Sequence, residues 1–353
     1  MERVGKCRLQ KRNLKPFLNL LFLVAIFGLT LWSVFHGEDL GQVLLFLRTA
    51  DLVYILSGIL CVVLFIVGES VVIYYLMRTL GSHIQFFHCC LYSFIGFFYS
   101  CITPSASGGQ PMQVVAMRKD HIPVAVSTVV LAIVTITYKL VLVLLGTAIM
   151  LIRPARIMIY LEPVEPLMYL GLALNIVCIA LLLLLVFHPS AVQVCAEKIF
   201  SFLNRIRPFK HPEKQAETLN HLISQYKGSA EFYRTNRHVI INVFFITLVQ
   251  RLLLFFVTWL TYRAFGLSGE SLPVIVLLQG MISVASDMLP LPGGMGVSEN
   301  LFLDIFLPIF GEALVLPGMM ISRGISYYTQ LFISALVTAA AAFIIKEKSS
   351  EQS

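Results

Sequence analysis

This sequence is built around apolar runs that are too long for a water-soluble domain. Residues 17–35 and 167–187 contain no charged side chain, and about 20 such residues in a helix cross a ~30 Å hydrocarbon layer. Hydrophobic residues make up 58% of the 353 positions and charged residues 13%, which excludes an ordinary globular protein with a polar exterior. The sequence therefore predicts an all-α integral membrane protein, because helices satisfy their own backbone in lipid.

A basic arm, residues 1–16, precedes the first apolar run. That run is too long for the core of a cleaved secretory signal, and residues 32–39 offer no small-residue cleavage site. We interpret it as a retained first helix. The seven cysteines form neither a disulfide framework nor a CxxC metal motif, so we predict no metal site and no cofactor.

Two interrupted apolar segments accompany the full spans. One, 86–117, is broken by proline and glycine at 103–111, and the other, 272–311, is broken at 290–296. Neither is compatible with a straight helix. About six full spans are expected, at 17–36, 51–77, 123–152, 167–187, 238–263 and 313–345.

The distribution of lysine and arginine predicts the orientation of the chain, because these residues near membrane ends stay on the cytoplasmic side. They are concentrated in 1–16, in the loop 188–237 and in the tail 346–353. We therefore predict a multi-pass protein of the cell membrane with both termini in the cytoplasm. Segment 86–117 then enters and leaves from the cytoplasm, and segment 272–311 enters and leaves from outside.

These predicted sides of the membrane divide the chain into two repeats, 17–152 and 167–345. The first begins in the cytoplasm and the second begins outside, so their topologies are opposite. Inverted repeats with interrupted helices are typical of transporters. Within the membrane, the polar groups of an irregular backbone need hydrogen-bond partners from protein or from a water-filled cavity, so such breaks mark a site buried in the protein. Ordinary full-length helix pairs with glycine-rich turns remain an alternative. Loop 188–237 lies within the second half, and its apolar residues at 191–209 fit either an amphipathic helix on anionic lipid or a solvated connector.

Ionisable side chains within the spans are candidates for function. Each costs at least ~2.5 kcal/mol at the centre of a span. One interpretation is that the cations, together with helix amino termini, hold an anionic head group such as a lipid phosphate. The other is that they form structural ion pairs or reach an interface. The candidate head-group residues are Arg251, Arg323, Lys139, Glu299 and Glu69, with Asp287 and Asp304 as further acidic groups.

The breaks themselves supply candidate hinge and backbone positions. Paired glycines suit a sharp turn or a close approach to a ligand. Ser105 and Ser107 fit either donation to a phosphate or helix capping. The hinge candidates are Thr103, Pro104, Ser105, Gly108, Gly109, Pro111, Pro290, Pro292, Gly293, Gly294 and Gly296.

At 103–111, 290–299 and 322–328 the sequence resembles the lysylphosphatidylglycerol synthase transmembrane-region family, also called flippase-like or YbhN-like proteins. The most specific element is Pro-Leu-Pro-Gly-Gly-Met-Gly-Val-Ser-Glu at 290–299, which is similar to the family's P-x-P-G-G-x-G-x-x-E signature. Gln110 and Gln113 depart from the family pattern. Many relatives carry an acidic residue at the first of these positions and a basic residue at the second. The matching positions are Pro104, Gly108, Gly109, Pro111, Pro292, Gly293, Gly294, Gly296, Glu299 and Arg323.

This resemblance implies lipid translocation, the role of the membrane domain of the multiple peptide resistance factor. The chain resembles that membrane domain and not the synthase domain attached to it. The expected cargo is an anionic or aminoacylated phospholipid, such as lysyl-phosphatidylglycerol, or a polyprenyl-phosphate-linked lipid. The alternative is phosphatidylglycerol lysyltransferase activity, which requires a separately encoded catalytic domain because 188–237 is too short to form one. Membrane phospholipids, and in that case a synthase, are the expected partners, with no direct contact to nucleic acid.

Two other functions have less support from the sequence. A lipid phosphatase would need a histidine beside Pro104-Ser105 or Ser322-Arg323, and His83, His88 and His121 lie outside these motifs. A small-solute carrier or channel is compatible with the spans, but the sequence shows no acidic ring or carbonyl-rich filter motif.

Overall fold

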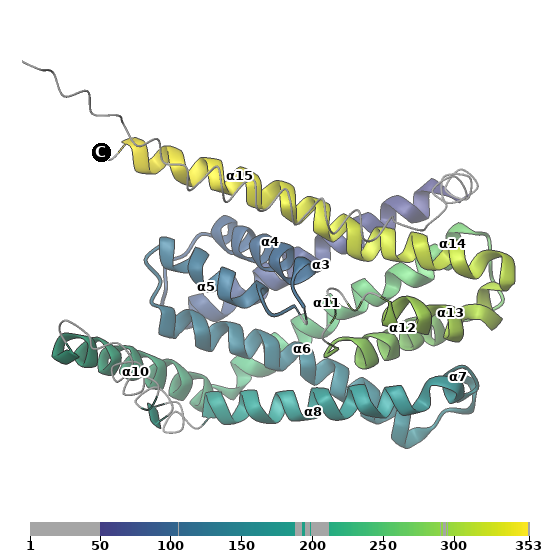
Figure 1. The fold of residues 1–353 in the computed structure, drawn as a ribbon, viewed down its shortest axis with the longest axis horizontal. Coiled ribbons are helices and arrows are strands. Elements are labelled where there is room, and N and C mark those ends of the chain that lie inside the picture. Colours follow the sequence, from purple (N-terminus) through teal and green to yellow (C-terminus); the bar gives the residue numbers. More distant parts are fainter. Residues whose placement is uncertain are drawn as a thin grey trace, which may run out of the picture. The chain divides into compact units, whose positions relative to one another are not determined.

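The computed structural model describes residues 50–104, 106–187, 193, 194, 198, 212–289, 291, 294 and 296–351, without the side chains of 212–216, 218, 219 and 342–351. Within these residues the fold is helical and contains no strand (Figure 1). The predicted arm 1–16, the first span 17–36 and nearly all of 188–211 lie outside the described residues.

Four described segments are long and apolar enough to cross a membrane: Leu52–Thr79, Val124–Ile152, Ala155–Val186 and Arg237–Ala264. They correspond to α3 (Leu52–Thr79), α6 (Val124–Ile152), α8 (Glu165–Phe187) with the short α7 (Ala155–Leu161) before it, and α11 (Arg237–Ala264). These helices agree with four of the predicted full spans. Asp51 starts α3 because its carboxylate accepts a hydrogen bond from the Val53 amide at 2.9 Å.

The two interrupted segments are broken where proline and glycine predict it. The first forms α4 (Phe86–Ile102) and α5 (Gly109–Lys119), and the second forms α12 (Leu272–Ser286) and α13 (Val297–Phe310). These helices have 17, 11, 15 and 14 residues, fewer than the ~20 that a full crossing needs. Their lengths fit re-entrant hairpins, while the inverted repeats themselves stay a prediction.

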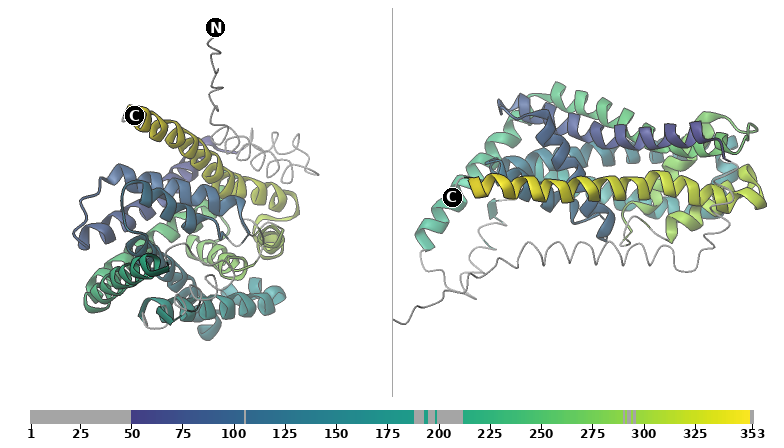
Figure 2. Two further views of the ribbon diagram at one scale, coloured as in Figure 1. Left: turned by 60° about the vertical axis from the view of Figure 1, so that its left-hand side comes forward. Right: turned by 90° about the horizontal axis from the view of Figure 1, so that it is seen from above.

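The last predicted span, 313–345, is also interrupted. It consists of α14 (Glu312–Arg323), a π-helical turn (Gly324–Tyr328) and α15 (Thr329–Glu351). A π turn inserts an extra residue into a helix and is often found at functional positions. Here it directly follows Arg323, and α15 continues along α4 and contacts α3 (Figure 2).

The glycines of the two breaks are needed for different structural reasons. A Cβ at Gly109 would lie 2.7 Å from the carbonyl oxygen of Gly96, so the absence of a side chain lets α5 approach α4. Gly294 and Gly296 have φ angles of 67° and 82°, in the left-handed region that favours glycine. The first break therefore uses glycine for close packing and the second uses it for a sharp turn.

Helices α3 and α11 form the central contact of the described part. Gly68 makes this approach possible, because a Cβ there would lie 2.9 Å from Cγ of Gln250. The amide of Gln250 donates to the carbonyl oxygen of Phe65 at 2.9 Å. The next residue on each helix, Glu69 and Arg251, thus lies at the same crossing.

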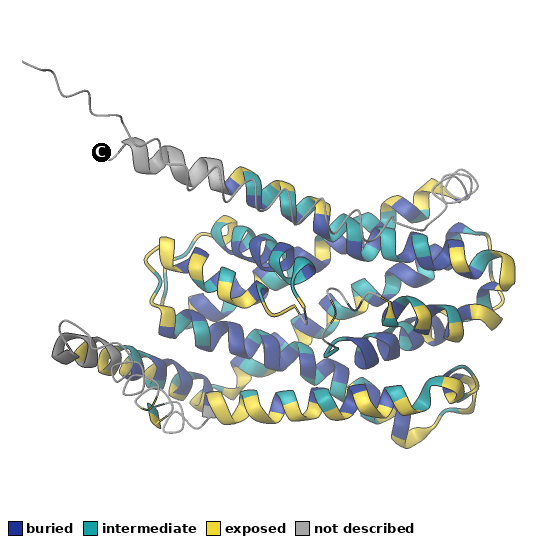
Figure 3. Ribbon diagram, viewed as in Figure 1, coloured by how far each residue is buried: buried dark blue, intermediate teal, exposed yellow. Residues whose placement is uncertain are grey.

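Apolar side chains are exposed along the outer side of α8 (Figure 3), including Val177, Leu181 and Leu184. Such a surface is unusual for a soluble monomer and is typical of a helix facing lipid. Helix α10 (Pro212–Thr235) has a different environment. The hydroxyl groups of Tyr226 and Tyr233 donate to the carbonyl oxygens of Leu185 and Leu76, so its apolar face packs on protein.

Candidate functional site

A cavity of about 440 Å³ lies where the first hairpin meets α3, α6, α8 and α11. Its volume falls within the ~300–1,000 Å³ typical of small-ligand sites. Most of its lining is apolar or neutral. Four of the described lining residues are charged: Glu69, Lys139, Arg251 and Asp287.

The guanidinium group of Arg251 lies between two aromatic rings. Its central carbon is 4.0 Å from the ring centroid of Tyr138 and 5.1 Å from that of Phe65. Its Nε is buried and has no hydrogen-bond partner among the described residues. Ring faces stabilise the cation but leave the in-plane N–H groups unused. Arg251 is therefore preorganised to donate hydrogen bonds to an anion.

Lys139 and Asp287 form an ion pair among the residues that line the cavity. The Lys139 Nζ lies 2.6 Å from Oδ2 of Asp287, and only 5% of Lys139 is exposed. The Tyr138 hydroxyl donates to both Asp287 oxygens at 2.9 Å, and Lys139 also donates to Asn175. These contacts match the ion-pair interpretation of Lys139, because its charge is balanced within the protein.

Glu69 has a different partner. Its Oε1 accepts a hydrogen bond from Nε2 of Gln113 at 2.7 Å. It forms no ion pair in the described part of the chain, although Arg251 is close enough to interact with it electrostatically. The carboxylate is therefore held by a neutral amide beside an arginine that it does not directly bind.

Arg323 and Glu299 form a second ion pair, outside the residues that line the cavity. The Arg323 Nε and Nη2 lie 2.8 Å and 2.7 Å from Oε1 of Glu299. The guanidinium also lies over the ring of Tyr327, which does line the cavity. A direct role of this pair in head-group binding stays a prediction. Asp304 is exposed.

The first break is organised by Thr103. Its hydroxyl donates to the carbonyl oxygen of Tyr99 at 2.7 Å and accepts from the amide of Gly108 at 2.9 Å. Ser107 lines the cavity, and Pro111 lies in the first turn of α5. Ser105, Pro290, Pro292 and Gly293 lie outside the described residues.

The sequence did not predict a role for Tyr138 or the hydrogen bond of Gln113, and it identified Asp287 only as a further acidic group. Tyr138 gives no signal in the sequence, because a tyrosine in an apolar span is ordinary. Gln113 was visible as a departure from the family pattern. Another departing residue, Gln110, donates to the hydroxyl of Thr135, so both glutamines fasten the first hairpin to neighbouring spans.

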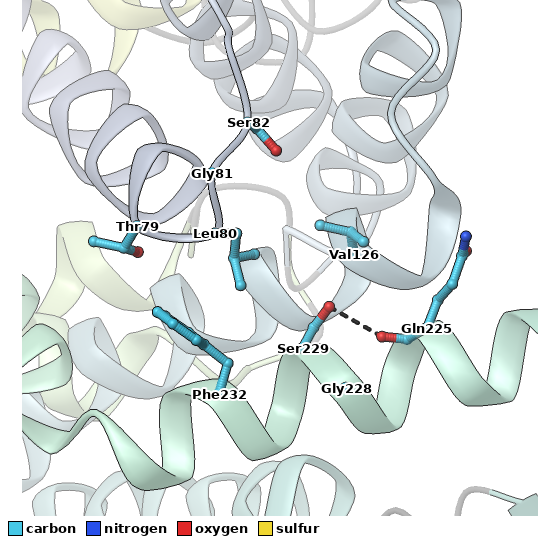
Figure 4. Close-up of a pocket in the computed structure, with 9 residues that line it drawn as sticks. All are labelled: Thr79, Leu80, Gly81, Ser82, Val126, Gln225, Gly228, Ser229 and Phe232. Carbon is cyan, nitrogen blue, oxygen red and sulfur yellow. Dashed lines mark hydrogen bonds between the residues drawn. The ribbon is translucent and has the colours of Figure 1, made fainter.

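A second cavity, of about 580 Å³, lies between the end of α3, the start of α6 and α10 (Figure 4). It is lined by Val126, Phe232 and small polar groups such as Ser229, whose hydroxyl donates to the carbonyl oxygen of Gln225. The described lining residues carry no charge. This cavity therefore offers less to a phosphate than the cavity beside Arg251, which has a cationic lining residue.

Comparison with known proteins gives a match over most of the chain. A protein-family model described as lysylphosphatidylglycerol synthase TM region matches residues 20–334. No curated protein matches the sequence.

Proposed function

Given that this chain belongs to the lysylphosphatidylglycerol synthase TM-region family, we propose that it moves a phospholipid across the bilayer with the head group in the cavity beside Arg251. Family membership supports a membrane role that concerns lipids. The observation that carries the proposal is Arg251, which lines a cavity of head-group size and forms no ion pair with any described residue.

A phosphate is the proposed anion. It is common to the expected cargoes, which are anionic or aminoacylated phospholipids and polyprenyl-phosphate-linked lipids. An arginine presents several donors in a fixed plane and binds phosphate through two of them. The amino-terminal end of α5, with Ser107 and Gln110 on the cavity wall, adds the favourable end of a helix dipole.

The proposed movement is alternating exposure of this cavity while the acyl chains stay in lipid. The first hairpin is the proposed moving part, because the uncharged side chains of Gln110 and Gln113 attach it to its neighbours by hydrogen bonds and not by ion pairs. The second hairpin carries Asp287 just after α12 and Glu299 in α13, and both are held by ion pairs.

The test is lipid transfer by the purified protein in vesicles. Phospholipids labelled on an acyl chain are quenched from outside, and the protected fraction reports movement between leaflets. We expect Arg251→Gln to slow transfer by about 10- to 100-fold, because a hydrogen bond to a charged group contributes roughly 1.5–3 kcal/mol. The matched control is Arg234→Gln on α10, where the side chain is 60% exposed and, among the described residues, pairs only with Glu231 of the same helix.

Equal transfer by the Arg251 variant and the control would remove Arg251 from the mechanism. Absence of transfer by the unaltered protein, for every lipid tried, would remove the proposed function.

The alternative function is lysine transfer to phosphatidylglycerol, which the family description favours. It is tested directly by adding lysyl-tRNA and phosphatidylglycerol to the purified protein. Formation of lysyl-phosphatidylglycerol without another protein would place this activity ahead of translocation.

A further inference from the structure

We infer that the head group carried in this cavity is a zwitterion with one phosphate and one ammonium group, as in phosphoethanolamine. This inference rests on the proposed lipid transfer and specifies its substrate class. It follows from the juxtaposition of Arg251 and Glu69 at the crossing of α3 and α11.

Arg251 and Glu69 offer one cationic and one anionic contact to the same ligand. The Arg251 Nε lacks a hydrogen-bond partner, and Glu69 accepts a hydrogen bond from Gln113 through Oε1 alone. The other oxygen, Oε2, has no hydrogen bond to any described residue. Both side chains line the cavity. A phosphate on the arginine and an ammonium on the free carboxylate oxygen would therefore satisfy the two groups together.

The remaining charges of the cavity do not alter this balance. Lys139 and Asp287 neutralise each other at 2.6 Å, and Asp287 is further satisfied by the Tyr138 hydroxyl. The four charged lining residues thus sum to zero, with one pair closed and one pair open to a ligand. A net-neutral ligand leaves the cavity neutral when it binds.

Charge balance distinguishes this ligand from two related head groups. A phosphoglycerol head group would satisfy Arg251 and leave Glu69 with an uncompensated negative charge. A lysyl-phosphoglycerol head group brings two ammonium groups, and the described lining offers one carboxylate outside an ion pair, that of Glu69, to receive them. An unpaired charge in a low-dielectric site is costly, so both head groups should enter this cavity less readily than a zwitterion.

A head-group series measured with the full-length protein tests the inference. Phosphatidylethanolamine, phosphatidylglycerol and lysyl-phosphatidylglycerol, all labelled on an acyl chain, are followed separately in vesicles of one fixed unlabelled composition. We expect phosphatidylethanolamine to move at least 10-fold faster than either of the others. Glu69→Gln should lower the phosphatidylethanolamine rate to that of phosphatidylglycerol, whereas Arg251→Gln should slow both.

Transfer of phosphatidylglycerol or lysyl-phosphatidylglycerol at the rate of phosphatidylethanolamine by the unaltered protein would overturn the zwitterion inference and leave the proposed lipid transfer intact. Failure to move any of the three would overturn both. The comparison of lipids needs no variant, so it remains decisive even if Glu69→Gln fails to fold.

Discussion

At the scale of single residues, three cations that look alike in the sequence have different surroundings. Lys139 and Arg323 each lie within 3 Å of a carboxylate oxygen, while Arg251 lies between aromatic rings and has a buried nitrogen without a partner. Each charge of a buried ion pair is balanced within the protein, and removing one partner leaves the other uncompensated. An arginine without such a partner is available to a ligand, which is why Arg251 rather than Lys139 carries the functional proposal.

We expect Lys139→Met to destabilise the protein by roughly 3–5 kcal/mol, because it leaves the Asp287 carboxylate buried without its cation. The double variant Lys139→Met with Asp287→Asn should regain most of that loss. Unfolding of the purified protein in detergent measures the effect. The matched control, Arg153→Ala, breaks an ion pair with Glu165 in which the arginine is 52% exposed, and it should cost less than about 1 kcal/mol. Equal losses for Lys139→Met and Arg153→Ala would contradict the buried role of Lys139.

At the scale of helices, small residues decide which elements touch. Helices α8 and α12 meet where Gly171 faces Val284 and Ala285, and a Cβ at Gly171 would lie 2.5 Å from backbone atoms of both. The Asn175 side chain one turn later donates to the carbonyl oxygen of Val284 at 3.1 Å. Because the opposing atoms belong to the backbone, they have no rotamer with which to make room.

Gly171→Ala should therefore lower stability by about 1–3 kcal/mol through overpacking. Gly228→Ala on α10 is the matched control, because nothing lies within 4 Å of its Cβ position and alanine is the better helix former. Thermal unfolding should show a lower Tm for the first variant and an unchanged or higher Tm for the second. A Tm for Gly171→Ala as high as that of the parent would mean that α8 and α12 separate more easily than their packing indicates.

At the scale of the whole molecule, the proposed transport depends on hairpins that enter from opposite faces. The described helices α5, α12 and α13 are too short to cross a ~30 Å layer as single helices at 1.5 Å per residue. Length alone does not fix the face from which each hairpin enters. That assignment comes from the positive-inside rule applied to the loops.

Single cysteines in a cysteine-free variant test this topology with an impermeant maleimide added outside intact cells. If the hairpins are re-entrant, Leu291→Cys should react, and Ser107→Cys should react only to the extent that the cavity it lines opens to the outside. His83→Cys and Ser268→Cys serve as the inside and outside controls, and all four native residues are exposed or line a break. The reverse result, with Ser107→Cys labelled and Leu291→Cys protected, would indicate full-length helix pairs and would remove the inverted-repeat argument.

Much of the fold was readable in the chain, because spans and breaks depend on local chemistry. Apolar runs predicted α3, α6, α8 and α11, and proline with glycine predicted both interruptions. The π turn after Arg323 was not predicted, because residues 324–328 contain no proline that would mark a break in the helix. Helix α10 was also not predicted, because the charge pattern of 188–237 fitted both an amphipathic helix and a solvated connector.

The candidate site was only partly readable, for a physical reason. Residue type and position within a span identify Glu69, Lys139 and Arg251 as side chains whose burial in the membrane costs free energy. They are therefore candidates for a functional or structural role. Whether a costly charge is balanced within the protein depends on contacts between distant residues. Asp287 comes 148 positions after Lys139, and Gln113 comes 44 positions after Glu69. Helix packing places Asp287 against Lys139 as an opposite charge, and it gives Glu69 only the neutral amide of Gln113. Arg251 and Glu69 are therefore the charged groups that can bind a ligand.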